Sequence, residues 1–122
     1  MDLFDTSMVG LQRAMSGSLL RQQVLANNLA NANTPGFKRS DVDFHSALDA
    51  VMNGPDPTPA AVQATGFSVQ TDSSTTMRAD GNNVDVDAEM SSLSENTLDY
   101  QSLTSVLTSR IKILETVIGQ TR

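Results

Sequence analysis

The side chains that could take part in acid–base or metal chemistry are few and poorly grouped. His45 is the single histidine, and the nearby Asp41 and Asp43 form a charged loop without a serine or cysteine nucleophile beside them. The chain has no cysteine, which excludes disulfides, thiolate zinc sites and cysteine nucleophiles. We therefore interpret His45 as a surface or helix-edge histidine and expect no catalytic residue.

The acidic segment 80–89 suggests a cation site, because carboxylates and amides recur along it. An EF-hand loop that starts at Asp80 would place Asp85 where glycine is required and Ser91 where the bidentate glutamate belongs. Glycine motifs that bind phosphate are also absent from the sequence. We interpret the segment as a polar turn followed by the start of a helix, and we expect no metal and no cofactor.

Length and composition indicate one small domain with a thin core. The chain has 122 residues, of which 39% are hydrophobic and 4% aromatic, and a formal net charge of −6. The acidic side chains are concentrated in residues 41–89, and a chain of this charge is not expected to bind nucleic acid. No segment reaches the roughly 18 apolar residues of a membrane span, and Asp2 and Asp5 stand where a signal peptide would be basic.

Two long amphipathic segments must position any functional residues. In the first, apolar residues recur at alternating steps of four and three, which predicts a helix over about residues 4–32. Asp2 is expected to cap this helix, and Pro35 and Gly36 are expected to end it. The packing residues that we assign to its apolar stripe are Met8, Leu11, Met15, Leu25 and Leu29.

The second amphipathic segment shows the same spacing and predicts a helix over about residues 86–118. Its apolar surface is wider than one seam, which indicates more than one neighbour. Asp85, Asp87 and Glu89 crowd the start, where carboxylates meet backbone N–H groups that lack helical partners, and Gly119 supplies the stop. The packing residues on this stripe are Leu93, Tyr100, Leu107, Ile111, Leu114 and Ile118.

The middle of the chain gives weaker signals. A short helix fits residues 42–51, and three prolines within residues 53–59 predict an extended linker. Residues 66–71 could pair with residues 75–78 as one short β-hairpin across the turn at Asp72. We therefore divide the chain into an N-terminal axial segment, residues 1–36, a central loop-rich segment, residues 37–85, and a C-terminal axial helix, residues 86–122.

The lengths of the two helices decide between a globule and an assembling protein. At 1.5 Å per residue they would measure about 43 and 50 Å, whereas a globule of this size has a diameter of about 35 Å. A two-helix hairpin buries one face of each helix, and few bulky apolar residues remain elsewhere to cover the other faces. The sequence predicts a mainly α protein whose long terminal helices pair in a coiled-coil-like layer and pack against other chains.

An asparagine-rich stretch ends the first predicted helix. Four asparagines fall within residues 27–33, although asparagine is a poor helix former. Asn27, Asn31 and Thr34 lie along one strip, where amides both donate and accept and can fix the register between helices of neighbouring subunits. Fraying of the helix end explains Asn33 well and Asn27 poorly. The residues that we assign to assembly and register are Asn27, Asn28, Asn31, Asn33, Pro35, Gly36 and Phe37.

Two motifs resemble a known family. The stretch from Arg21 to Lys38 resembles the N-terminal signature of flagellar rod and hook axial proteins. The stretch from Arg78 to Met90 resembles the FlgB family of proximal rod proteins in particular. The resemblance implies a structural, non-enzymatic subunit of the bacterial flagellar basal body, with its terminal helices in an axial layer and its central segment outside.

The same resemblance implies how the chain reaches its place and what it contacts. It implies export through the flagellar type III apparatus without a cleaved signal peptide, and a position in the periplasmic rod. The implied partners are copies of the chain, other rod subunits, the rod adapter protein, and the membrane-ring and export-gate proteins, with no nucleic acid, small-molecule substrate or membrane insertion. An alternative from another class is an acidic helical-hairpin binding module, such as a secretion chaperone or adaptor.

Overall fold

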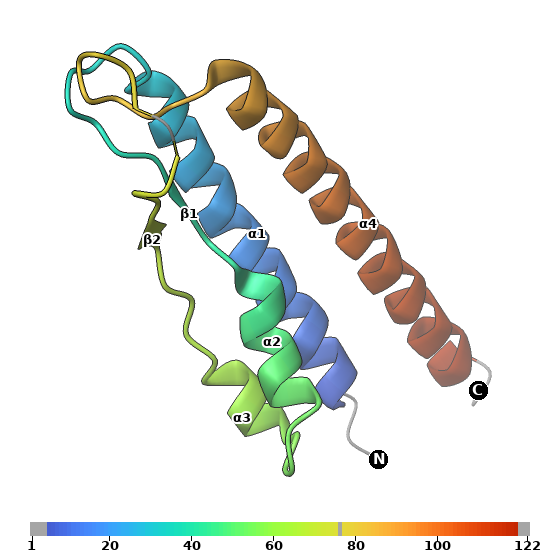
Figure 1. The fold of residues 1–122 in the computed structure, drawn as a ribbon. Helices are drawn as coiled ribbons and strands as arrows, with labels where there is room; N and C mark the ends of the chain where they lie inside the picture. The colour runs from blue at the N-terminus through green and yellow to red at the C-terminus, as the bar shows by residue number, and fades with distance from the viewer. Residues whose placement is uncertain (1–4, 76, 120–122) are drawn as a thin grey trace.

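A computed structural model describes residues 5–75 and 77–119 as a mainly α protein built on a long helical hairpin (Figure 1). This confirms the predicted fold class, including a small two-stranded sheet in the middle. The elements in chain order are α1 (Thr6–Ala30), β1 (Ser40–Asp41), α2 (Phe44–Met52), α3 (Pro59–Gln63), β2 (Gln70–Thr71) and α4 (Val86–Gly119). In the described part of the chain, no helix is both long enough and apolar enough to cross a membrane.

Helices α1 and α4 lie side by side and run in opposite directions (Figure 1). Their observed bounds confirm the two helices that the periodicity predicts. Asp5 caps α1, because its side chain accepts a hydrogen bond of 2.8 Å from the Met8 backbone N–H. The predicted cap, Asp2, lies outside the described residues. With 34 residues, α4 is about 51 Å long and therefore exceeds the diameter of a globule of this size.

The hydrophobic core lies on the face of α1 that is turned away from α4 (Figure 1). Its buried members are Val9, Val42, Phe44, Leu48 and Val62, which come from α1, α2, α3 and the segment before α2. The expectation that little would be left to cover the other faces of the long helices is therefore wrong for α1. It fails because the short helices α2 and α3 place their few large apolar side chains together on one patch of α1.

The predicted β-hairpin is wrong, because residues 70–71 pair with a different segment. Gln70–Thr71 pairs antiparallel with Ser40–Asp41, in the register Ser40 to Thr71 and Asp41 to Gln70, and not with residues 75–78. The cause is the Asn28 side chain, which accepts a bond from the Ser40 N–H at 2.9 Å and donates to the Ser40 carbonyl at 2.7 Å. Because Asn28 holds this segment extended against α1, its other edge is available to β2.

The proline-rich linker is shorter than predicted. A short helix, α3, begins at Pro59, with the Thr58 hydroxyl accepting a hydrogen bond of 3.2 Å from the Ala61 N–H. Proline suits the first position of a helix because its missing N–H would have no helical partner there. The predicted short helix over residues 42–51 is confirmed as α2.

Candidate functional site

The two sequence motifs meet at the end of the hairpin opposite the described chain ends (Figure 1). We call residues 31–39 and 78–85 together the hairpin junction. The Gly36 N–H donates to the Asp80 carbonyl at 2.9 Å, and the Asn83 N–H donates to the Phe37 carbonyl at 3.3 Å. Gly36 and Gly81 both have positive φ, of 73° and 81°, which other residues rarely adopt. The turns that bring the motifs together therefore depend on glycine.

Asn82 is the central residue of the hairpin junction and is completely buried. Its side-chain N–H₂ donates to the carbonyls of Asn31 at 2.9 Å and Thr34 at 2.8 Å, and its Oδ1 accepts from the Val84 N–H at 2.7 Å. Carbonyls at the end of a helix lack helical partners, so Asn82 satisfies the end of α1 from 51 residues away in the sequence. The sequence indicates a turn in this segment but gives no sign of its burial.

A buried carboxylate joins the first turn of α4 to α1. Glu89 is 1% exposed, and its side chain accepts bonds from Arg39 Nε at 2.5 Å and from Asn28 Nδ2 at 3.0 Å. Glu89 was predicted to meet unpartnered N–H groups at the helix start, and for its side chain this is wrong. Asp85 takes that role by accepting bonds from the N–H groups of Asp87 and Ala88.

A second polar contact lies two turns further along α4. Asn96 is 1% exposed, and its side-chain N–H₂ donates to the Ser18 carbonyl at 2.9 Å and to Gln22 Oε1 at 2.8 Å. The hydroxyl of Ser18, which is also 1% exposed, donates to Asn96 Oδ1 at 3.1 Å. We call Ser18, Gln22, Asn28, Glu89 and Asn96 the polar seam. Buried polar groups of this kind fix the register of paired helices, because a shift would leave them without partners.

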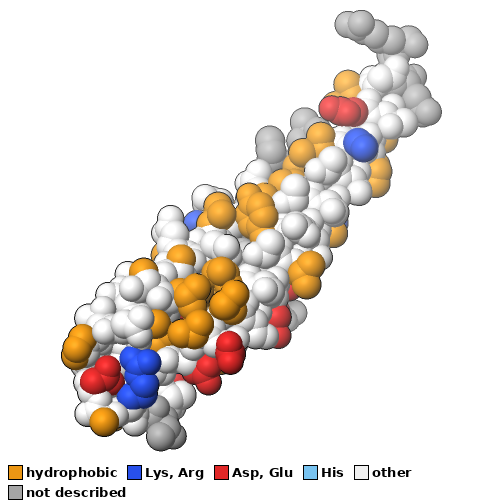
Figure 2. All heavy atoms as spheres, turned by 90° about the horizontal axis from the view of Figure 1, so that it is seen from above, with side chains coloured by type: hydrophobic (Ala, Val, Ile, Leu, Met, Phe, Trp, Pro, Cys, Tyr) orange, Lys and Arg blue, Asp and Glu red, His pale blue; other side chains and the backbone are white. Residues whose placement is uncertain are grey.

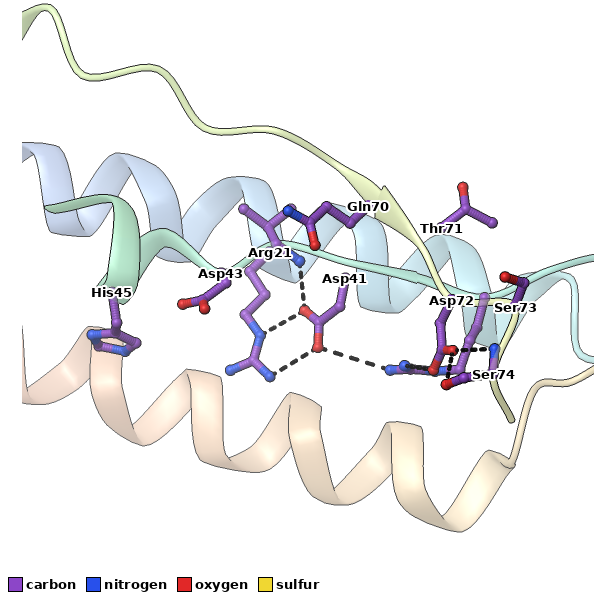
Figure 3. A pocket seen from close by; sticks show the side chains of 11 residues that line it. Arg21, Asp41, Asp43, His45, Gln70, Thr71, Asp72, Ser73 and Ser74 are labelled. Carbon is purple, nitrogen blue, oxygen red and sulfur yellow. Dashed lines mark hydrogen bonds and ion pairs between the residues drawn. The ribbon is translucent and has the colours of Figure 1, made fainter. Parts of the chain in front are cut away.

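A polar pocket of about 620 Å³ opens beside the hairpin junction (Figure 3). Asp41 lies between two arginines, with Arg21 Nε at 2.8 Å from its Oδ1 and an Arg39 nitrogen at 3.8 Å from its Oδ2. Arg39 also pairs with Asp72 at 3.2 Å. His45 at the pocket edge is exposed, as predicted, and its Nε2 lies 3.4 Å from the Asp99 carboxylate. Asp41 and Asp72 in this pocket are therefore each paired with an arginine.

Within residues 5–75 and 77–119, no group of three or more histidine, cysteine or acidic side chains is placed to hold a metal ion.

The ion pairs in the pocket shift the pKa values of their own members. The hydrogen bond to Asp41 raises the pKa of Arg21 against the opposing effect of burial. Burial alone would raise the pKa of Asp41, but hydrogen bonds from Arg21 and the Val42 N–H outweigh it and lower that pKa below its ordinary value of 3.8.

The lowered pKa of Asp41 predicts a loss of stability in acid. A carboxyl whose pKa is lower in the folded than in the unfolded state stabilises the fold above its ordinary pKa, and this contribution disappears as the pH falls through the folded-state value. We expect Asp41→Asn to lower Tm at pH 6, and the difference from the natural chain to shrink steadily below pH 3.8. Thermal unfolding followed by circular dichroism at several pH values measures this. Asp56→Asn, at an exposed linker carboxylate, is the control, and a pH-independent effect of Asp41→Asn would contradict the prediction.

The residues predicted to set the register of an assembly lie at and before the hairpin junction. The Asn31 side chain donates to the Asn27 carbonyl at 2.8 Å and accepts from the Thr34 hydroxyl at 3.1 Å. Asn28 is fully buried in the polar seam. The remaining members are exposed or half-buried: Asn33, Pro35, Gly36 and Phe37. Their contribution to contacts between subunits stays a prediction.

The predicted packing residues fall into three groups by exposure. Met8 and Leu25 are buried, whereas Ile111 and Ile118 are exposed by 40% and 60%. The half-buried group contains Leu11, Met15, Leu29, Leu93, Tyr100, Leu107 and Leu114. Within α4 the fully buried side chains are polar, namely Glu89 and Asn96. The hairpin is therefore held by a polar seam flanked by half-buried apolar residues, a pattern that periodicity alone did not indicate.

Known proteins with similar sequences agree on one family. The family model described as flagella basal body rod protein matches residues 10–38. The FlgB basal body rod protein of Bacillus subtilis is 33% identical, with 97% of each chain covered. The FlgB protein of Escherichia coli is 32% identical over 97% of this chain and 96% of its own, and that of Yersinia enterocolitica is 31% identical over 98% of both. The chain therefore belongs to the FlgB family of flagellar basal body rod proteins.

Proposed function

We propose that this flagellar rod subunit is not an enzyme and assembles by packing its long helices against copies of itself and other rod subunits. The observation that carries the proposal is the exposed apolar surface of α4, on which Leu98 and Ile113 are each 63% exposed and Val106 is 48% exposed. Figure 2 shows hydrophobic side chains gathered along the length of the elongated molecule. Large exposed apolar patches are typical of surfaces that another protein covers.

The hairpin junction and the polar seam suit a mechanical role. A rod that transmits torque from the motor to the filament needs subunits that deform little under load. Buried hydrogen bonds hold α1 and α4 at both places, and a shift of one helix along the other would leave Asn28, Glu89 and Asn96 unpaired. We infer that Asn28 fixes register inside the subunit, while the exposed Asn27 and Asn33 are available to neighbouring subunits.

Membership of the FlgB family supports further proposals on location and partners. We propose that the chain occupies the proximal, periplasmic part of the rod and contacts the rod adapter protein and the membrane-ring and export-gate proteins. We also propose that it is exported without a cleaved signal peptide. In this arrangement residues 1–36 and 86–122 form the axial layer, and residues 37–85 face outward.

Ile113→Asp tests the packing surface. The side chain is 63% exposed, so the fold of the isolated chain is expected to survive, as checked by circular dichroism. In an assembly the new carboxylate would be buried without a partner, at a cost of several kcal/mol, and we expect loss of rod incorporation and of swimming in a strain that lacks its own copy of the gene.

Gln101→Asp is the matched control, because it introduces the same charge at an exposed polar position of α4. We expect this variant to swim normally. Normal motility of the Ile113→Asp strain would contradict the packing proposal. A variant that stays out of the rod but remains a soluble oligomer bound to an export substrate would favour the binding-module alternative.

A further inference from the structure

We propose that Asn53–Gly54 is a site of spontaneous deamidation that the folded end of α2 protects. Asn53 is the C-terminal cap of α2 and its side chain is exposed. Among pairs of asparagine and the residue that follows it, Asn–Gly deamidates most readily. The reason is that glycine has no side chain to obstruct attack by its own backbone nitrogen. The pair belongs neither to the hairpin junction nor to the polar seam.

The reaction needs no enzyme and no reagent other than water. The Gly54 backbone N–H loses its proton to solvent, and the nitrogen attacks Asn53 Cγ. A new C–N bond closes a five-membered succinimide, the bond from Cγ to the side-chain nitrogen breaks, and that nitrogen leaves as ammonia. Water then adds to one of the two ring carbonyls, and the bond from that carbon to the Gly54 nitrogen breaks. Opening at Cγ leaves aspartate at position 53, and opening at the backbone carbonyl carbon leaves isoaspartate. Each product carries one additional negative charge.

The folded geometry opposes ring closure in two ways. At the observed ψ of 8° for Asn53, the Gly54 nitrogen eclipses the Asn53 backbone nitrogen, whereas the ring requires it to eclipse Cβ. The Gly54 N–H is also engaged, because it donates to the Val51 carbonyl at 3.2 Å. Reaction therefore requires this hydrogen bond to break and the backbone to rotate, which means that the end of α2 must open.

The packing of the same turn explains why glycine occupies position 54. A Cβ atom there would lie 3.0 Å from the Ala50 carbonyl oxygen and 3.2 Å from the Val51 carbonyl oxygen. A larger residue would slow deamidation but would crowd two backbone atoms that cannot easily move. The turn that ends α2 thus favours the residue that makes Asn53 reactive, and protection depends on the turn staying closed.

Deamidation is expected to weaken α2 once it has occurred. The new carboxylate lies at the C-terminal end of the helix, where the helix dipole already disfavours negative charge. Asp49, which is one turn earlier, adds repulsion of the same sign. Because α2 supplies Phe44 and Leu48 to the hydrophobic core, loosening it also exposes the reactive pair further.

The test follows deamidation in the whole chain at pH 8 and 37 °C, in native buffer and in urea, by mass spectrometry of proteolytic peptides. In urea, Asn53 is expected to react first, ahead of Asn82 and Asn96, which precede larger residues. In native buffer the rate at Asn53 is expected to fall at least tenfold. Equal rates in the two buffers would overturn the protection, and faster reaction at another asparagine would overturn the assignment of the site.

Two variants complete the experiment. Asn53→Gln keeps the amide but would have to form a less favourable six-membered ring, so the peptide that contains position 53 should stay unmodified in urea. Asn53→Asp represents the product, and we expect its Tm to fall by about 2 °C. An unchanged Tm for Asn53→Asp would overturn the proposed effect on α2.

Discussion

Gly17→Ala is expected to destabilise the protein by about 2–3 kcal/mol, which corresponds to a fall in Tm of about 10 °C. The same change within an ordinary helix would stabilise it by about 0.5–1 kcal/mol, because alanine favours helix more than glycine. Here a Cβ at position 17 would lie 2.5 Å from Phe44 Cβ and 2.7 Å from Phe44 Cγ. Phe44 is completely buried in the core, and a closely packed core resists such a displacement.

Gly10→Ala is the matched control, because Gly10 is also a buried glycine of α1 that faces α2. Its added Cβ would lie 3.3 Å from the Met52 sulfur, at the flexible end of a side chain that can adapt. We expect the free energy of unfolding of Gly10→Ala, measured by urea denaturation, to change by less than about 0.5 kcal/mol. If the two variants were equally stable, the close approach of α1 and α2 at Gly17 would not limit the fold.

The long helices could be predicted from the sequence because the signals that define them are local. Steps of four and three residues specify one face of a helix, and acidic caps specify where it begins. For α4 the predicted and observed bounds differ by one residue at the end. For α1 the sequence favours Asp2 as the cap, whereas Asp5, which has the same side chain one turn later, is the cap in the structure.

The pairing of β1 with β2 could not be predicted because it depends on a distant side chain. Residues 66–71 alternate in polarity and lie close in sequence to residues 75–78, and both features are usual signals of a hairpin. The outcome is decided instead by Asn28, whose amide bonds both backbone groups of Ser40. No spacing rule connects a residue in the last turn of a helix to a strand 12 residues later.

The polar seam was missed for a related physical reason. Ser18 and Gln22 continue the steps of four and three that define the apolar stripe of the first helix, but periodicity does not identify the polar partner that each of them needs. The burial of Glu89 and Asn96 depends on the folded structure, in which their side chains lie within 3.0 Å of their partners on α1. The exposed apolar residues of α4 are a feature that the sequence does predict, because the apolar surface of this helix is wider than one seam.

The Asn82→Asp variant is expected to lose about 3–5 kcal/mol of stability although it changes one NH₂ group to an oxygen. The two hydrogen bonds to the carbonyls of Asn31 and Thr34 disappear, and an acceptor or a charge takes their place. The site is completely buried, so water cannot readily replace the lost donors. Thermal unfolding measures the loss, and faster amide hydrogen exchange at the hairpin junction and the end of α1 would locate it.

Asn33→Asp provides the control, because it introduces the same change at an exposed residue of the hairpin junction. It is expected to cost less than about 1 kcal/mol, from repulsion by the C-terminal end of α1. Equal losses in the two variants would mean that charge near the helix end, and not the hydrogen bonds of Asn82, accounts for the effect.

Unfolding measured at low pH separates the two contributions to the loss of stability in Asn82→Asp, namely the added charge and the missing hydrogen-bond donors. A protonated carboxyl at position 82 can donate one of the two missing hydrogen bonds and carries no charge. The deficit relative to the natural chain at the same pH is therefore expected to shrink as the pH is lowered, without disappearing. Asn82→Ala cannot donate at any pH, so its deficit should not recover in this way. An equal deficit in Asn82→Asp and Asn82→Ala at every pH would contradict the role of the Asn82 donors in holding the end of α1 to the start of α4.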